Sequence, residues 1–408
     1  MSNFSNLSRR GFLKIGGACA GLAVTAGMPE LSYATVPGNK IFVFVMQNGG
    51  PDALDYVCPF NDSIYRNERP VLRRSAPGID ASSVLDINHG YYGLSPNLGS
   101  MRNLYMSGKV GFFHSVAFSD SQVHGGSHFA ATNDMVRGAP NDSAVRTGWV
   151  NRLMQVLGGA TGMSMAESNR SMPFLDGSGN VLTYQAPGPA TDVGLVNMMR
   201  ELYSPLSGLS DLLQQGYSQD MVLSSSLAGH ENLTNAPRIN DMCNALRERM
   251  ALAAYMAIAG VANCFVLRGD GNDTHNGAVV AQWARAYADG MAAFHAIMEG
   301  AGRSNDYLVV TGGEFGRTVN ESDNGTQHGD GGLMTVMSGN STLMAGIGGQ
   351  VLPGQLNLNQ RSINNSMRPT VYAYDIIRGL LRAFYGLTNA EAMQVFPNRI
   401  ISNVGGNA

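Results

Sequence analysis

The chain has 408 residues, of which 44% are hydrophobic and only 14% are charged, and its formal net charge is −3. This composition excludes a highly charged disordered chain, and the length suits one large domain or two ordinary ones. The 51 glycines are too many for a helical bundle, and they lack the three-residue period of collagen. A weakly acidic chain without basic runs argues against binding to nucleic acid or to an anionic membrane.

The first 34 residues predict an export signal. Residues 8–14 read SRRGFLK, the pattern of twin-arginine signal peptides, and an apolar stretch rich in glycine and alanine follows to Met28. Residues 32–34 (Ser-Tyr-Ala) offer a cleavage site, so we expect a mature chain that starts near Thr35. The apolar stretch is too short for a good membrane span. We therefore expect a periplasmic or secreted protein that has no stable membrane span once the signal is removed.

Five apolar runs predict strands that are buried on both faces of a sheet. They cover residues 40–47, 110–117, 262–267, 307–312 and 333–338, and they are rich in β-branched and aromatic residues. Helical patterns cover residues 95–107, 235–260, 277–300 and 371–385. Strands that alternate with helices indicate an α/β fold, with a mostly parallel central sheet and helices on both faces.

The middle of the chain has a different composition. Residues 140–235 are rich in Gly, Ser, Asn and Pro, which predicts a cap-like, loop-rich insertion rather than another layer of sheet. We find no internal repeat. Residues 35–408 are therefore expected to form a single domain that carries this insertion.

Polar clusters lie next to the predicted strands, and ligands of open α/β sheets gather at the carboxyl ends of strands. In chain order the clusters are Asp52, Ser127 with His128, Asp273 with His275, Glu314 with Arg317, and His328 on the glycine-rich loop before the last strand. In a parallel sheet these loops would open on one edge. Carboxylates and imidazoles gathered there would suit zinc, manganese or a similar divalent cation.

Each cluster also has a purely structural interpretation, which the sequence leaves open. These interpretations are a turn at Asp52, a helix N-cap at Asp273, the start of a helix at Ser127 and His128, a salt bridge between Glu314 and Arg317, and a solvated loop at His328. No single motif is strong. The functional interpretation depends on the observation that polar clusters lie next to several different predicted strands.

Taken together, the motifs resemble a known family. The segments GGPDAL (49–54), SHF (127–129), TGW (147–149), DTH (273–275), EFGRT (314–318) and HG (328–329) occur in this order. They resemble the secreted, twin-arginine-exported family named domain of unknown function 1501, over residues 40–397. That family is similar to the alkaline phosphatase-like superfamily, which includes sulfatases and cofactor-independent phosphoglycerate mutases. The resemblance therefore implies an alkaline phosphatase-like fold.

The same resemblance implies a metal-dependent hydrolase of phosphate or sulfate esters. The implied metal ligands are Asp52, Asp273, His275, Glu314 and His328. The implied catalytic residues are Ser127 as nucleophile, Arg317 as the group that holds the anionic oxygens, and His128 as a further ligand or a general acid.

The chain also departs from the superfamily pattern. Asp273 and His275 are two residues apart instead of one helical turn, Phe315 stands where relatives carry His, and Gln327 stands where they tend to carry Asp. These departures imply either a site with one cation or a site that has lost hydrolysis. The alternative function is therefore a non-catalytic binding or assembly protein, whose partner belongs to the cell envelope.

Overall fold

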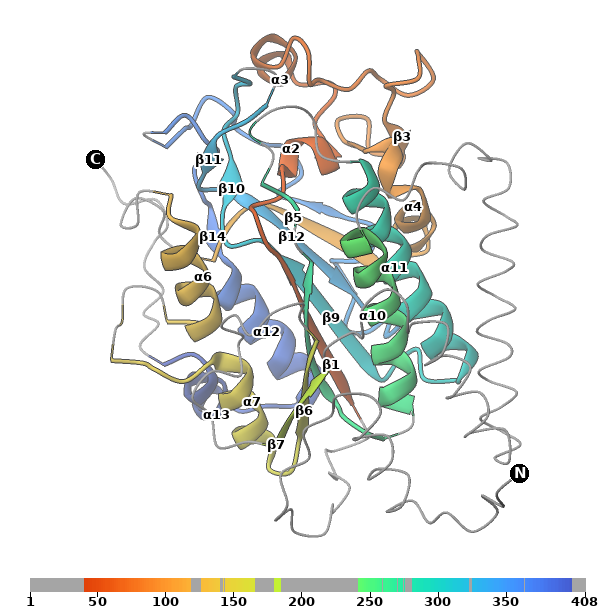
Figure 1. Cartoon of the computed structure of the whole chain (residues 1–408). Coiled ribbons are helices and arrows are strands. Elements are labelled where there is room, and N and C mark those ends of the chain that lie inside the picture. The colour runs from red at the N-terminus through yellow and green to blue at the C-terminus, as the bar shows by residue number, and fades with distance from the viewer. Residues whose placement is uncertain are drawn as a thin grey trace.

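The structure is a computed structural model, and it describes residues 40–118, 126–139, 142, 144–165, 180–184, 241–258, 260–269, 271–273, 275, 281–322, 325–362 and 364–397. Its centre is a nine-stranded sheet with the order β13-β5-β12-β9-β1-β8-β6-β7, and β14 pairs with β5 (Figure 1). The strands are β1 (Ile41–Gln47), β5 (Val110–Ala117), β6 (Thr161–Met165), β7 (Asn180–Tyr184), β8 (Cys264–Gly269), β9 (Tyr307–Gly312), β12 (Gly332–Met337), β13 (Val351–Leu352) and β14 (Val371–Tyr372).

All strands of this sheet except β12 run in the same direction. β1 is parallel to β8 and β9, and β8 is parallel to β6, whereas β12 is antiparallel to both β5 and β9. The predicted α/β fold with a mostly parallel sheet is therefore confirmed. The reversed direction of β12 places its amino end at the edge where the other strands have their carboxyl ends.

Helices cover both faces of the sheet (Figure 1). One face packs against α4 (Gly99–Met106), α10 (Asp241–Ile258) and α11 (Ala281–Gly300), and the other against α6 (His128–Arg137), α7 (Trp149–Leu157), α12 (Ala373–Tyr385) and α13 (Asn389–Val395). Strand β1 shows why its sequence is apolar throughout. Its side chains alternate between the two cores, with Ile41, Val43 and Val45 in the first and Phe42, Phe44 and Met46 in the second.

Part of the predicted insertion belongs to the sheet instead of forming surface loops. Residues 149–184 supply α7, β6 and β7, and the two strands extend the sheet in parallel beyond β8. Strand β6 reads TGMSM, and its Gly and Ser residues explain why composition favoured loops. Residues 185–235 lie outside the described residues, and so does the predicted signal at 1–34.

Smaller elements lie beyond the carboxyl edge of the sheet (Figure 1). After β1 come α2 (Ala53–Tyr56), α3 (Ser63–Glu68) and a small antiparallel sheet of β2 (Val57–Cys58), β4 (Gly93–Leu94) and β3 (Leu85–Asp86). Between β9 and β12 lies the antiparallel pair of β10 (Gly316–Arg317) and β11 (His328–Gly329). The candidate site residues lie at the same edge, on the loops after β1, β8 and β9, at the start of α6 and on the β10–β11 pair.

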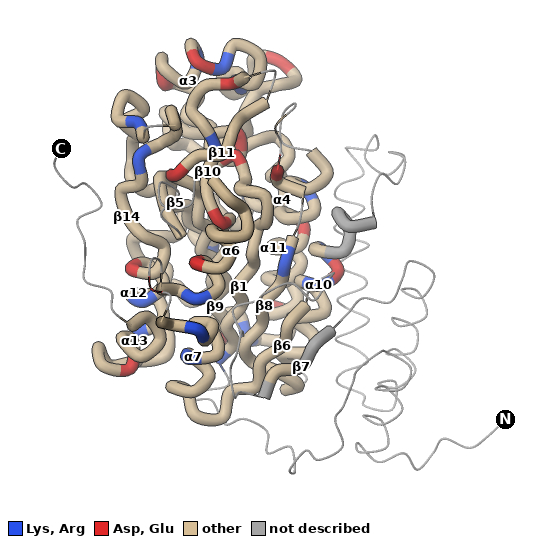
Figure 2. Tube along the Cα trace, turned by 60° about the vertical axis from the view of Figure 1, so that its left-hand side comes forward, with Lys and Arg blue, Asp and Glu red and all other residues tan. Residues whose placement is uncertain are grey.

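Charged residues are sparse in the sheet and dispersed elsewhere. Figure 2 shows Lys, Arg, Asp and Glu interspersed over the helices and loops of the described chain, with few on the strands. Among the same residues, no helix has both the length and the apolar character that crossing a membrane requires.

A buried histidine on β5 makes the fold sensitive to acid. His114 is fully buried, its Nε2 atom lies 2.9 Å from the carbonyl oxygen of Val57, and its ring stacks on Tyr92. Burial lowers the pKa of His114 to about 4. Its contribution to stability is therefore fully present above about pH 6.5 and is lost as the pH falls towards 4, because the unfolded chain then binds a proton that the folded chain does not.

When the pH is lowered from about 7 to about 5, we expect the free energy of unfolding of the wild type to fall by about 2 kcal/mol more than that of His114→Gln. Glutamine keeps an N–H donor for Val57 but carries no ring that a proton can charge. Urea unfolding at both pH values measures the difference. The same acid-induced loss in both proteins would show that His114 does not cause it.

Candidate metal centre

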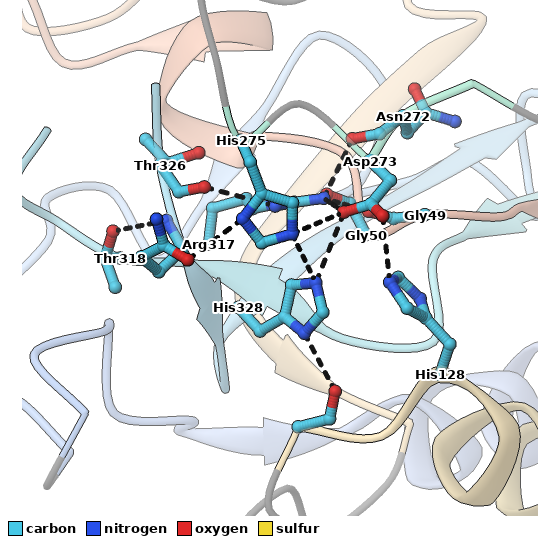
Figure 3. Close-up of polar contacts among 12 residues, drawn as sticks. Gly49, Gly50, His128, Asn272, Asp273, His275, Arg317, Thr318, Thr326 and His328 are labelled. Atoms are coloured by element: carbon cyan, nitrogen blue, oxygen red, sulfur yellow. Dashed lines mark hydrogen bonds and ion pairs between the residues drawn. The ribbon is translucent and has the colours of Figure 1, made fainter. Parts of the chain in front are cut away.

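Three histidines and one aspartate meet at the carboxyl edge of the sheet. His128 begins α6, Asp273 and His275 follow β8, and His328 lies on β11. Figure 3 shows their three imidazole rings around the Asp273 carboxylate. Oδ1 of Asp273 lies 3.0 Å from Nε2 of His275 and 3.2 Å from Nε2 of His328. Its Oδ2 lies 3.3 Å from Nε2 of His128.

Each of these imidazoles is held through its other nitrogen. The Nδ1 atoms contact oxygen acceptors, which are Glu314 Oε1 at 2.7 Å for His128, Gln327 Oε1 at 2.9 Å for His275, and the Gly126 carbonyl at 2.8 Å for His328. Because oxygen acceptors bind a proton donor, each Nδ1 carries the N–H. In the neutral ring the Nε2 atom then carries a lone pair, so three lone pairs point into the cluster.

This donor set fits a divalent transition metal. The Nε2 atoms of His275 and His328 are 2.9 Å apart, and Nε2 of His128 is buried without a hydrogen-bond partner. His128, Asp273 and His328 each offer a ligand atom within 4.8 Å of the others. Lone pairs at such distances repel one another unless a proton or a cation lies between them. Imidazole and carboxylate ligands suit zinc and manganese, and an outer hydrogen bond from Nδ1 commonly orients a metal-binding histidine.

The electrostatics of the cluster keep Asp273 ionised. Burial alone would raise the pKa of Asp273, but the hydrogen bond from Arg317 and the positive charge of Arg317 outweigh it and lower the pKa to about 2. The hydrogen bond to Glu314 raises the pKa of His128 against the effect of burial, whereas burial lowers the pKa of His328. The Asp273 side chain is 44% exposed. The cluster therefore combines a fixed negative charge with access from solvent.

Arg317 joins two loops of the site and does not face solvent. Its buried Nε donates to the Gly50 carbonyl at 2.7 Å, and its guanidinium also donates to the carbonyls of Gly49 and Asn272. The same group donates to Oδ1 of Asp273 at 2.7 Å. One side chain thus connects the loop after β1 with the loop after β8. This arrangement favours a structural role over the predicted contact with substrate oxygens.

The loop after β1 approaches Asp273 so closely that it requires glycine. Gly49 has a φ of +102°, and a Cβ atom there would lie 2.4 Å from the backbone nitrogen of Asp273. Glycine alone adopts such a conformation readily and leaves space for the neighbouring chain. The Gly-Gly-Pro-Asp turn of the sequence therefore brings its carbonyl groups within reach of Arg317.

Asp52 lies at the same edge, but its carboxylate is paired with an arginine. It caps α2 by accepting from the Leu54 N–H at 3.1 Å, and Arg69 binds it in bidentate fashion at 2.6 and 3.1 Å. Arg69 is fully buried and also donates to the carbonyl of Val319. Asp52 is therefore the N-cap of α2, and its role as a metal ligand stays a prediction.

The remaining predicted site residues have local partners. Glu314 is 1% exposed and accepts from His128 and from the Gly49 N–H at 2.9 Å. Ser127 is the N-cap of α6, with its Oγ 3.5 Å from the Ala130 nitrogen, so Ser127 and His128 do begin a helix. The nucleophilic role of Ser127 stays a prediction.

The sequence did not predict the contacts that three further residues make around the site. Arg69 pairs with Asp52 from 17 positions away, and no motif connects the two. Gly126 contributes only a backbone carbonyl, and every residue type has one, so the sequence gives no signal for this contact. Gln327 directly precedes His328, and this adjacency was the one available signal.

Comparison with known proteins gives a family match and a general structural similarity. Residues 214–355 match the family described as "Protein of unknown function (DUF1501)". No protein of curated function matches the chain.

Thirteen chains of solved structures match. One is Ps i-CgsB, at 8% identity and a TM-score of 0.37, covering 86% of this chain and 73% of that chain. Another is a protein in the alkaline phosphatase superfamily from Vibrio parahaemolyticus, at 12% identity and a TM-score of 0.35, covering 82% and 70%. A third is the lipoteichoic acid synthase LtaP from Listeria monocytogenes, at 10% identity and a TM-score of 0.37, covering 94% and 80%. Similarity at this level assigns no function.

The geometry separates the role of Asp52 from that of Asp273. We expect Asp52→Asn to destabilise the protein by about 3–5 kcal/mol, because it leaves the buried charge of Arg69 without a partner, while metal content stays unchanged. Asp273→Asn is expected to lose metal at a smaller cost in stability, because Asp273 is 44% exposed and Arg317 keeps the backbone carbonyls of Gly49, Gly50 and Asn272 as acceptors. Urea unfolding and elemental analysis of both variants measure these effects. Metal loss in Asp52→Asn with unchanged stability would identify Asp52 as a ligand instead.

Proposed function

We propose that this protein is an exported, metal-dependent hydrolase of phosphate or sulfate esters, with His128, Asp273, His275 and His328 as its metal ligands. The observation that carries the proposal is the convergence of three Nε2 atoms on one ionised carboxylate (Figure 3). The four side chains are between 23% and 44% exposed. An anionic ester therefore has access to the cluster from solvent.

The residues of the chain have distinct parts in this proposal. A divalent cation would supply Lewis acidity toward an ester oxygen. Arg317 holds Asp273 in place, and the Nδ1 hydrogen bonds hold the imidazoles. Ser127 remains the candidate nucleophile, because it directly precedes His128 and lies at the amino end of α6, where the helix dipole stabilises an anionic oxygen.

A non-catalytic role on the same scaffold is the second candidate. The burial of Arg317 favours it, because the arginine that would hold the anionic oxygens of an ester is directed to backbone carbonyls and Asp273. In that case the cluster would contribute to binding a partner of the cell envelope.

Protein loaded with Zn²⁺ or Mn²⁺ is expected to hydrolyse aryl phosphate or aryl sulfate esters. His128→Ala and His328→Ala should each lose metal and lower the rate at least about 100-fold, because a Lewis acid contributes several kcal/mol to such reactions. His89→Ala serves as the matched control, since His89 lies in the region after β3 and contacts Tyr92. Full metal occupancy without turnover would favour the second candidate. Metal content below about one tenth of an equivalent would contradict a metal site.

Export by the twin-arginine pathway is the second part of the proposal. The double variant Arg9→Lys, Arg10→Lys keeps the positive charge but removes the arginine pair of residues 8–14. We expect the wild type to reach the periplasm shortened by its signal, and the double variant to stay in the cytoplasm at full length. Cell fractionation followed by immunoblotting measures both. Equal export of the two proteins would exclude the pathway.

A further inference from the structure

We infer that Glu314 is a positioning residue, which aims His128 at the cation and is not itself a metal ligand. The inference rests on the metal site of the proposed function, but it does not depend on ester hydrolysis. It reassigns a carboxylate that the superfamily resemblance makes a ligand.

The buried carboxylate of Glu314 is fixed by two partners, the His128 ring and the Gly49 backbone. Its side chain is 1% exposed, and its Oε1 lies 2.7 Å from Nδ1 of His128. The backbone N–H of Gly49, just after β1, donates to Oε1 at 2.9 Å and to Oε2 at 3.2 Å. The Gly49 N–H lies at the end of a central strand and is therefore held rigidly. Because it binds Glu314, and Glu314 binds His128, the ring at the start of α6 is positioned relative to β1.

The two nitrogens of His128 show why Glu314 does not reach the cation. Nε2 of His128 faces Oδ2 of Asp273 at 3.3 Å, whereas Nδ1 on the opposite side of the ring faces Glu314. An oxygen bound to Nδ1 therefore lies behind the ring, away from a cation bound to Nε2.

Glu314 is also the strongest of the three anchors. His275 and His328 donate from Nδ1 to a neutral amide oxygen and a neutral carbonyl oxygen, whereas His128 donates to a carboxylate at the shortest distance, 2.7 Å. A hydrogen bond to a charged acceptor is about twice as strong as a neutral one. Such a bond also makes the opposite nitrogen a more basic ligand.

The next residue supports the same rings by packing. The Phe315 ring centre lies 4.7 Å from that of His128 and 4.5 Å from that of His328. Gly50 leaves space for it, since a Cβ atom there would lie 2.6 Å from the Phe315 ring. Glu314 and Phe315 thus hold His128 by a hydrogen bond and by an apolar contact. Phe315 stands where the superfamily carries a ligand, and in this chain it packs against two of the proposed ligands.

The test is titration of the metal-free full-length protein with Zn²⁺, followed by the absorption spectrum of the Co²⁺ form. We expect Glu314→Ala to weaken Zn²⁺ binding by about 10–100-fold and to keep one site. Glu314→Gln is expected to lose less, because it keeps the length and one acceptor oxygen. In both variants the Co²⁺ bands should shift, since the His128 ring turns. Glu321→Gln is the matched control, because Glu321 also accepts backbone N–H groups, from Val71 and Leu72.

Two results would overturn the inference. One is loss of Zn²⁺ binding in Glu314→Gln as complete as in Asp273→Asn, which would make Glu314 a ligand. The other is wild-type affinity and an unchanged Co²⁺ spectrum in both Glu314 variants. A different result would contradict the proposed hydrolase alone: the wild type binds Zn²⁺ and the Glu314 variants behave as expected, but no ester is hydrolysed. A wild type that binds no Zn²⁺ would overturn both.

Discussion

The carboxylate of Asp273 is the group on which the candidate site depends. Its two oxygens lie within 3.3 Å of the Nε2 atoms of His128, His275 and His328, and Arg317 binds it from the buried side. Arg317 also binds the carbonyls of the loop after β1. Three imidazoles and an arginine, which come from four separate stretches of the chain, therefore meet at this one carboxylate. A cation placed among the same groups would reinforce this contact.

The direction of one strand decides whether His328 can take part. The loop before a parallel strand opens at the amino edge of a sheet, which would have placed His328 opposite the other site residues. β12 instead runs antiparallel to β5 and β9, so its preceding loop and the β10–β11 pair lie at the carboxyl edge. The expectation of a common edge was correct for His328 only because this part of the sheet is not parallel.

The predictable part of the fold is the part that local sequence controls. The strand expected at 110–117 matches β5, and the one at 307–312 matches β9, because a strand buried on both faces must be apolar at every position. β6 and β7 were not predicted, since β6 contains Gly and Ser and both strands are short and lie in a segment rich in Gly, Ser, Asn and Pro. In the site, Asp273, His275 and His328 were recognised as candidate ligands and do lie together. Asp52 and Glu314 were recognised as well, but their carboxylates face other partners.

By itself, the sequence determined the fold class and the positions at which polar side chains leave the sheet, because both follow from the alternation of apolar strands and helices along the chain. Only the tertiary structure decided what each side chain contacts. Arg69 forms an ion pair with Asp52, Glu314 accepts a hydrogen bond from Nδ1 of His128, and Arg317 donates hydrogen bonds to backbone carbonyls. A carboxylate or guanidinium pairs with the nearest complementary group in space, and these partners come from distant segments that are brought together only when the sheet forms.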